Sequence, residues 1–162
     1  MIRRVVAANT KALRSLQFAR KVTAFAFLSA LSISALAKDR GVLERIAYAA
    51  FLADQGSAVC ASARLDFSSE DAASFRDSKG YAQRIKQQII SGLSEEEGRS
   101  VLIAAADRAK NEAREATAKF RSEADMQQWC TSTVAPFVRQ VLGDYANNRA
   151  VVDELIRKAK TD

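Results

Sequence analysis

The sequence predicts an all-α protein: a single small bundle of four to five helices, held by one disulfide and preceded by a signal peptide. Apolar residues recur at spacings of three and four through most of the chain. Strand-like alternation of branched and polar residues is absent, and Pro136 is the only proline. Because the chain has no linker, repeat or low-complexity stretch after residue 37, we expect residues 38–162 to form one helical domain.

The first 37 residues read as a signal peptide. Residues 1–21 are basic without an acidic residue, and residues 22–37 ("VTAFAFLSALSISALA") carry no charge. The segment ends with Ala35 and Ala37, the small-x-small pattern that signal peptidase recognises, so cleavage is expected before Lys38. Two alternatives stay open. The apolar run can be an uncleaved anchor, although it is shorter than the roughly 20 residues of a spanning helix, or the segment can be an organelle presequence.

Removing this segment changes the meaning of the charge balance. The chain has 25 basic and 19 acidic residues, for a formal net charge of +6. Six of the basic residues lie in residues 1–21, so the mature chain keeps 19 basic against 19 acidic residues. It has no Lys/Arg run that tracks phosphates, and nucleic acid is therefore not expected as a partner. We expect a periplasmic or secreted protein, or one anchored in the inner membrane if the apolar run is retained.

Export also decides how the two cysteines are interpreted. An oxidising compartment favours pairing, and Cys60 and Cys130 allow only one intramolecular disulfide. Such a bond closes a loop of about 70 residues, which the chain-entropy model equates with about 4 kcal/mol of stability. A redox-active pair is the alternative. It is less favoured because neither cysteine has a charged neighbour within three positions to stabilise a thiolate.

The helices are predicted from periodicity and capping residues. The first spans about 39–64, with Gly56 as a point where it can break. One helix, or two divided near Gly80, occupies 69–91 after an N-cap at Ser68 or Ser69. Ser94 and Glu97 match a capping box that starts the next helix. Glu95, Glu96 and Glu97 resemble a metal or acid–base cluster, but their place in a first helical turn favours the capping role.

The second half of the chain holds the largest apolar cluster. Pro136 either lies in the first turn of a helix capped by Thr133, or bends a helix that is continuous from Ser122. A last amphipathic helix is expected after Asn147 and Asn148. On the preceding helix, an alanine stripe allows close packing, either inside the bundle or in a homodimer. Its residues are Ala106, Ala109, Ala113 and Ala116.

Known catalytic and cofactor motifs are missing from the sequence. The chain has no His, which excludes Ser-His-Asp and Cys-His systems and removes the usual general base at neutral pH. Carboxylates such as Asp66 with Glu70 or Asp71 are better explained as caps and solvated acids. We therefore expect no enzyme, no cofactor, no metal site and no catalytic residue. The prediction is a non-enzymatic protein that binds another protein, accessory, inhibitor-like or chaperone-like in type. The main alternative is a small-ligand-binding bundle with a pocket lined by Trp129 and Tyr145. A membrane-tethered accessory subunit is expected if residues 22–37 are retained.

Overall fold

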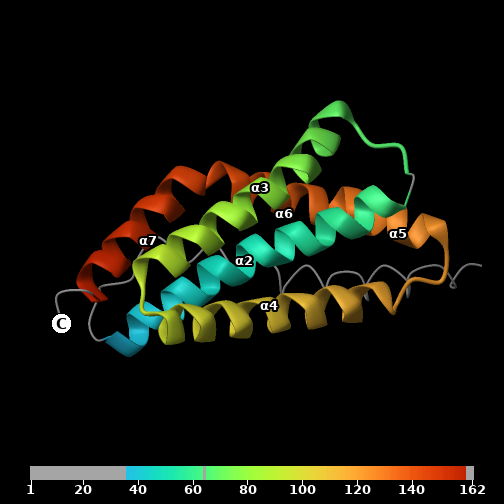
Figure 1. Cartoon of the computed structure of the whole chain (residues 1–162). Helices are drawn as coiled ribbons and strands as arrows, with labels where there is room; N and C mark the ends of the chain where they lie inside the picture. The colour runs from blue at the N-terminus through green and yellow to red at the C-terminus, as the bar shows by residue number, and fades with distance from the viewer. Residues whose placement is uncertain (1–35, 64, 160–162) are drawn as a thin grey trace, which may run out of the picture. The chain divides into compact units, whose positions relative to one another are not determined.

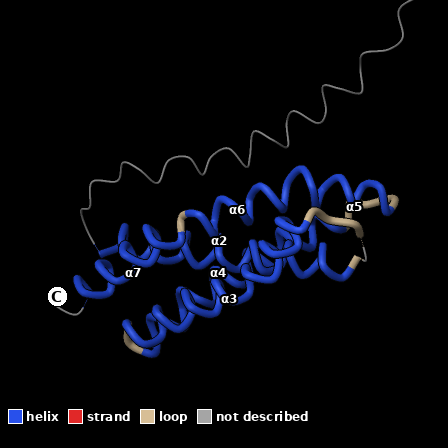
Figure 2. The backbone as a smooth tube through the Cα atoms, turned by 90° about the horizontal axis from the view of Figure 1, so that it is seen from above, coloured by secondary structure: helices blue, strands red, loops and turns tan. Residues whose placement is uncertain are grey.

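The computed structural model describes residues 36–63 and 65–159. The described chain is helical: α2 (Leu36–Ser62), α3 (Ser69–Gly92), α4 (Glu95–Thr117), α5 (Glu123–Trp129), the π-helix η2 (Cys130–Val134), α6 (Ala135–Gly143) and α7 (Tyr145–Ala159). Since α5, η2 and α6 follow one another without a break, they form one continuous helix. The described residues thus form the predicted all-α bundle of five helices, with helices and loops only in Figure 2.

Helix α2 is the central element of the bundle. It packs against both α3 and α4, which lie on either side of it in Figure 1, while α6 and α7 cover α3. Its inner face is made of small and medium apolar residues, so neighbouring helices approach closely. The buried residues of this face include Leu43, Ile46, Ala47, Ala50 and Ala53. None of the described helices is both long enough and apolar enough to cross a membrane.

Gly56 does not break α2, because the glycine is used for close packing. A Cβ atom built at this position would lie 3.1 Å from Cγ1 of Val134 in η2. The missing side chain therefore lets η2 approach α2 one turn before Cys60. There the predicted disulfide joins Cys60 to Cys130, and both cysteines are fully buried. The first helix is thus held to the fourth, as expected.

Pro136 lies inside a continuous helix. The predicted helix start with Thr133 as its N-cap is therefore wrong, and the alternative, a helix that is continuous from Ser122, is confirmed. Ser122 caps α5 by accepting a hydrogen bond from the Asp125 amide at 3.1 Å. One widened turn then precedes the proline, and the Ala135 amide bonds to the Cys130 carbonyl. Proline has no amide to donate and its ring collides with the preceding turn of an α-helix. A π-turn supplies the extra space.

Two other boundaries differ from the sequence prediction. Helix α3 runs through Gly80 without division, because the surrounding residues keep one buried face from Phe75 to Ile89. Helix α7 begins at Tyr145 and includes Asn147 and Asn148, which were expected to precede it. The Asn148 amide donates a hydrogen bond of 2.9 Å to the buried Tyr81 hydroxyl. This contact with another helix holds asparagine inside α7, a position that its intrinsic propensity disfavours.

The predicted signal-peptide boundary falls at the edge of the described chain. Ala35, together with the basic and apolar segments, lies outside the described residues, whereas Ala37 belongs to the first turn of α2. Cleavage before Lys38 would remove two residues from a helix of 27. The packed part of α2 begins later, at Leu43. Cleavage before Lys38 would therefore leave the residues of this buried face in place.

Candidate functional site: an apolar groove between α3 and α4

The groove depends on a tight turn that brings the end of α3 next to the start of α4 (Figure 1). Helix α3 ends at Gly92, and the Ser94 hydroxyl begins α4 by accepting a hydrogen bond from the Glu97 amide at 3.4 Å. The Glu97 carboxylate accepts a hydrogen bond of 2.6 Å from the Ser94 hydroxyl, whereas in a capping box it would accept one from the Ser94 backbone amide. Only Leu93 and Ser94 separate the two helices. Such short connections produce antiparallel neighbours.

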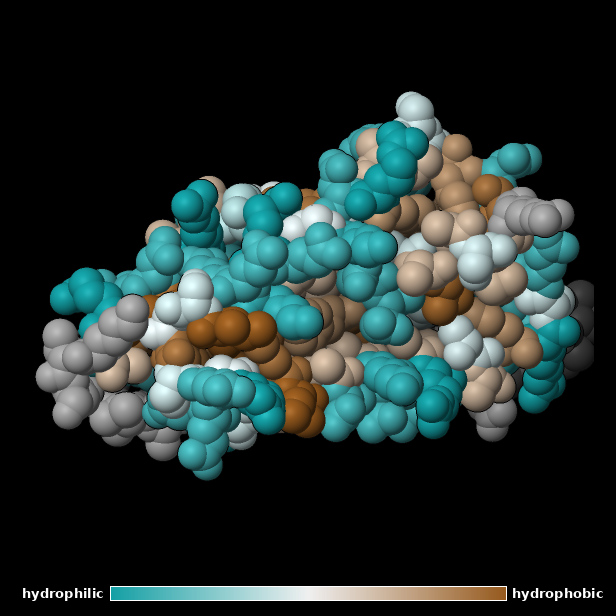
Figure 3. All heavy atoms as spheres, in the orientation of Figure 1, coloured by the Kyte–Doolittle hydropathy of each residue, from teal (hydrophilic) through white to brown (hydrophobic). Residues whose placement is uncertain are grey.

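A cavity of about 640 Å³ lies along this helix pair, with α2 beneath it. Its lining comes from α2, α3, the intervening turn and α4: Phe51, Lys86, Ile90, Ser94, Glu95, Gly98, Arg99, Leu102, Ile103 and Ala106. The volume falls within the range of small-molecule pockets, but the cavity is an open groove. Figure 3 shows hydrophobic side chains gathered between hydrophilic ones where α3 and α4 meet.

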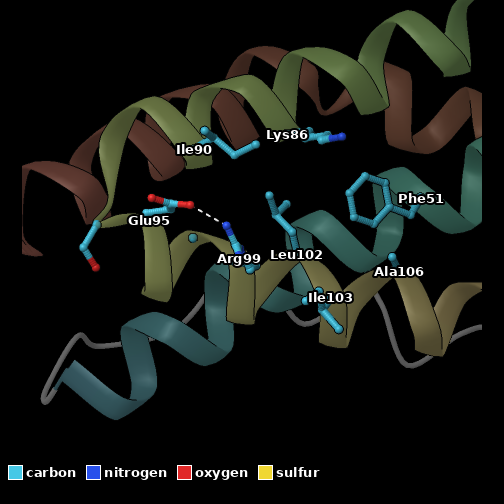
Figure 4. A pocket seen from close by; sticks show the side chains of 10 residues that line it. Phe51, Lys86, Ile90, Glu95, Arg99, Leu102, Ile103 and Ala106 are labelled. Atoms are coloured by element: carbon cyan, nitrogen blue, oxygen red, sulfur yellow. Dashed lines mark hydrogen bonds and ion pairs between the residues drawn. The ribbon is translucent and has the colours of Figure 1, made fainter.

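Two isoleucines give the groove its apolar walls. Ile90 on α3 is 51% exposed and Ile103 on α4 is 54% exposed, although both helices are otherwise polar on their outer faces. Figure 4 shows Ile90 on α3 and Ile103 on α4, with Leu102 between them and Phe51 further along the hollow. Leu102 is nearly buried and Phe51 is half-buried. Single exposed apolar residues are ordinary, but a contiguous set around a hollow is typical of an interaction site.

Charged groups border the apolar lining. Lys86 lies one turn before Ile90 on α3 and is exposed. Within the described part of the chain it has no ion-pair partner. On the opposite wall, Arg99 pairs with Glu95 along α4, with both side chains largely exposed. Because exposed pairs of this kind contribute little stability, the Arg99 guanidinium can turn to another partner at small cost. The lining carries two positive charges and one negative charge.

A second cluster joins α2 to α4 around a buried tyrosine. The Tyr48 ring is 3% exposed, and its hydroxyl donates a hydrogen bond to the Glu112 carboxylate. The Arg108 guanidinium lies 4.3 Å from the ring centroid. Burial, followed by the bond to Glu112, raises the pKa of Tyr48 above its ordinary value, and Arg108 opposes this shift. The polar face of α4 thus contributes two residues, Arg108 and Glu112, that hold Tyr48 in place.

The structure places Trp129 and Tyr145 in separate aromatic contacts. Trp129 packs on Phe120, with ring centroids 5.3 Å apart. Tyr145 meets the buried Tyr81 edge to face at 5.3 Å, and Arg84 lies over the Tyr145 ring. Both rings are half-buried and neither lines the groove.

The acidic residues considered as a catalytic pair make structural contacts. Asp71 and Glu70, at the start of α3, both face Arg139 of α6, and Arg139 donates a hydrogen bond to Asp71. The backbone carbonyl of Asp66 accepts a hydrogen bond from the Gln127 side chain at 3.1 Å. These contacts hold the loop before α3 and the first turn of α3 against α5 and α6. They do not lie near the groove lining.

Two members of the alanine stripe are used inside the bundle. Ala109 is fully buried and Ala113 nearly so, on the side of α4 that packs against α2. Ala116 is half-buried, and the exposed Ala106 lines the groove. A homodimer through this stripe stays a prediction, but only Ala106 and part of Ala116 are open to a second chain.

The groove was missed by sequence reasoning, although a signal for it exists. Ile89 with Ile90, and Leu102 with Ile103, are consecutive apolar pairs on amphipathic helices. One residue of each pair lies on the buried face, so the neighbouring residue must point elsewhere. The sequence does not show that the second residues of two such pairs line the same hollow, because this depends on how α3 and α4 pack.

No group of three or more metal-ligating side chains occurs among the residues the structure describes. No protein-family model, curated protein or solved structure matches the chain.

Proposed function

We propose that the chain is an exported, non-enzymatic accessory protein that binds another protein through the groove between α3 and α4. The observation that carries this proposal is the pair of half-exposed isoleucines, Ile90 on α3 and Ile103 on α4, which line one hollow together with Phe51. Burying such a surface against a partner supplies the main driving force for association. Lys86 and Arg99 at the border supply the polar contacts that typically surround an apolar interface centre.

Export is supported by the basic and apolar N-terminal segments, the Ala35-x-Ala37 pattern and the disulfide. A disulfide stabilises a small domain where cellular reductants are absent. The periplasm or the extracellular space suits these features together. If residues 22–37 are retained, the same groove would serve a membrane-tethered subunit.

Photo-crosslinking in the native host tests this proposal. A benzophenone amino acid is placed at Ile103 in the groove and, as a matched control, at the exposed Glu115 on the same helix. We expect a protein adduct from position 103 that is absent from position 115. A second substitution, Ile90→Asp, should abolish this adduct because it puts a charge on the opposite wall. Circular dichroism establishes that each variant remains helical.

Binding of unfolded clients provides a second readout. If the protein is chaperone-like, it should slow the aggregation of a reduced model client, and Ile90→Asp should weaken this effect. Equal labelling from positions 103 and 115, together with no effect on client aggregation, would contradict the proposed function. A small-ligand bundle would then be favoured, which predicts ligand-dependent fluorescence of Trp129.

A further inference from the structure

Each wall of the groove is a row of side chains that repeats every four residues along one helix. On α4, Glu95, Arg99 and Ile103 follow one another at intervals of four residues, and on α3 Lys86 and Ile90 have the same interval. Residues four apart lie on one face of a helix. Each wall is therefore a ridge of the kind that another helix packs against.

Two small residues of α4 belong to the lining and act differently. Gly98 is buried and lets α4 approach α3 closely, since a Cβ atom there would lie 3.5 Å from the Ile89 carbonyl oxygen, whereas the exposed Ala106 leaves space beside the ridges. The α4 segment from residue 95 to residue 106 rises about 16 Å at 1.5 Å per residue, which is about three helical turns. The groove therefore has the length of a short helix. The apolar centre of its lining is formed by Ile90, Leu102 and Ile103.

The fold favours a helical occupant over an extended one. The described residues contain no strand, so they offer no open sheet edge to which an extended segment could add. A helix placed between α3 and α4 would instead bury its apolar face against Ile90 and Ile103. This is the helix-in-groove mode, in which side chains at i, i+3, i+4 and i+7 act as anchors.

The charges of the lining favour an occupant with an acidic side chain over one with a basic side chain. Lys86 stands on the α3 wall without an ion-pair partner among the described residues, and Arg99 on the α4 wall is held only by an exposed Glu95. An acidic side chain beside the apolar anchors would be attracted by both cations. A basic side chain in the same place would be repelled by Lys86, so the groove discriminates by repulsion as well as by attraction.

We infer that the groove binds an amphipathic helix of about three turns, whose apolar face carries an adjacent carboxylate that pairs with Lys86. This inference rests on the proposed function, because it names the class of partner segment for the same site.

A charge-exchange experiment with synthetic peptides tests the inference. The first fluorescent peptide is an Ala/Gln-based helix of about 14 residues, with three leucines on one face and one glutamate beside them. A matched peptide carries lysine in place of that glutamate. Fluorescence anisotropy with the purified disulfide-bonded protein should give about three- to fivefold tighter binding of the glutamate peptide, the effect of one partly exposed ion pair. Lys86→Glu should reverse the preference. Lys110→Glu, on an exposed part of α4 outside the groove, should leave it unchanged.

Filling the groove provides an independent readout. Ala106→Leu extends a side chain into the hollow and should weaken binding of the glutamate peptide by about tenfold or more. Ala104→Leu adds the same side chain at an exposed position of α4 that does not line the groove. It should bind the peptide as the unmodified protein does. Both substitutions place a good helix former on a solvent-exposed surface, so both variants should fold.

Several results would overturn the inference. Equal affinity for the two peptides, or a Lys110→Glu effect equal to that of Lys86→Glu, would show that Lys86 does not select a carboxylate. If the unmodified protein is a dimer in sedimentation equilibrium and the Ala106→Leu variant is a monomer, the groove binds a second copy of the chain. Binding of dodecanoate, with binding of neither peptide, would show that the groove takes a small amphiphile. If position 103 gives a crosslink but the protein does not distinguish the two peptides, the inference fails and the proposed function stands. If neither the crosslink nor the peptide selectivity is found, the inference and the proposed function both fail.

Discussion

Gly92 is the residue at which one added methyl group would disturb the bundle most directly. It is buried at the end of α3, and a Cβ atom there would lie 2.3 Å from Cδ1 and 2.6 Å from Cγ2 of Ile156. Because both branches of the isoleucine are too close, a rotation of one terminal atom cannot relieve the contact. The residue that ends α3 therefore also allows α7 to pack against this end of the helix.

We predict that Gly92→Ala lowers the free energy of unfolding by about 1–3 kcal/mol through overpacking. Gly143→Ala is the matched control, since a Cβ atom at the end of α6 would have no neighbour within 4 Å. It should raise stability by about 0.5–1 kcal/mol, because alanine restricts the unfolded chain and favours the helix. Urea denaturation of both variants provides the measurement. Equal effects of the two substitutions would disprove the packing role of Gly92.

Tyr48 shows how much of a residue's role depends on its neighbours in space. The sequence marks it as part of the apolar face of α2, but it does not show that Glu112 and Arg108 reach it from α4. The i,i+4 spacing of Arg108 and Glu112 suggested a pair with each other. In the folded chain both contact Tyr48 instead, since the hydroxyl at the edge of the core needs a polar partner.

At the scale of elements, the disulfide and the π-turn act at the same place. Cys130 is the first residue of η2, and Cys60 lies in the last turn of α2, beyond the close approach at Gly56. The bond fixes the position of the widened turn relative to the central helix. The α5–η2–α6 helix is therefore held near the point where its regular hydrogen bonding changes.

We predict that replacing both cysteines, Cys60→Ala with Cys130→Ala, lowers the free energy of unfolding by about 2–4 kcal/mol, because the sequence between them is no longer closed in the unfolded chain. The unmodified protein should lose a similar amount when dithiothreitol reduces the bond, and the double variant should not respond to the reductant. Chemical denaturation followed by circular dichroism measures both effects. Unchanged stability after verified reduction of the unmodified protein would argue against the stapling role.

The order of the helices was more predictable than their exact ends. Ser68, Ser94 and Ser122 each accept a hydrogen bond from the amide three residues later, so three starts are visible as local side-chain chemistry. The start of α7 was missed, because its asparagines are held by a contact with Tyr81 of α3. Local signals predict a boundary only where the capping group and its partner are close in sequence.

At the scale of the whole molecule, the proposed cleavage before Lys38 would decide the compartment and the net charge. We predict that the protein recovered from its native host has an intact mass corresponding to a chain that begins at Lys38. Its two cysteines should alkylate only after reduction. Such a chain carries 19 basic and 19 acidic residues, so it should migrate as a nearly neutral protein. A full-length mass with thiols that alkylate directly would refute export and the disulfide in the cell together.

The sequence by itself determined the helical class, the pairing of Cys60 with Cys130 and most helix starts. Each of these follows from short-range periodicity, from local capping, or from there being only two cysteines. The tertiary structure alone decided that Gly56 and Gly92 are packing positions, that Pro136 follows a π-turn, and that Ile90 and Ile103 line one groove. These features depend on which faces of distant helices meet. A helix's own residues specify that it has an apolar face, but the shape left between two helices is set by their mutual approach.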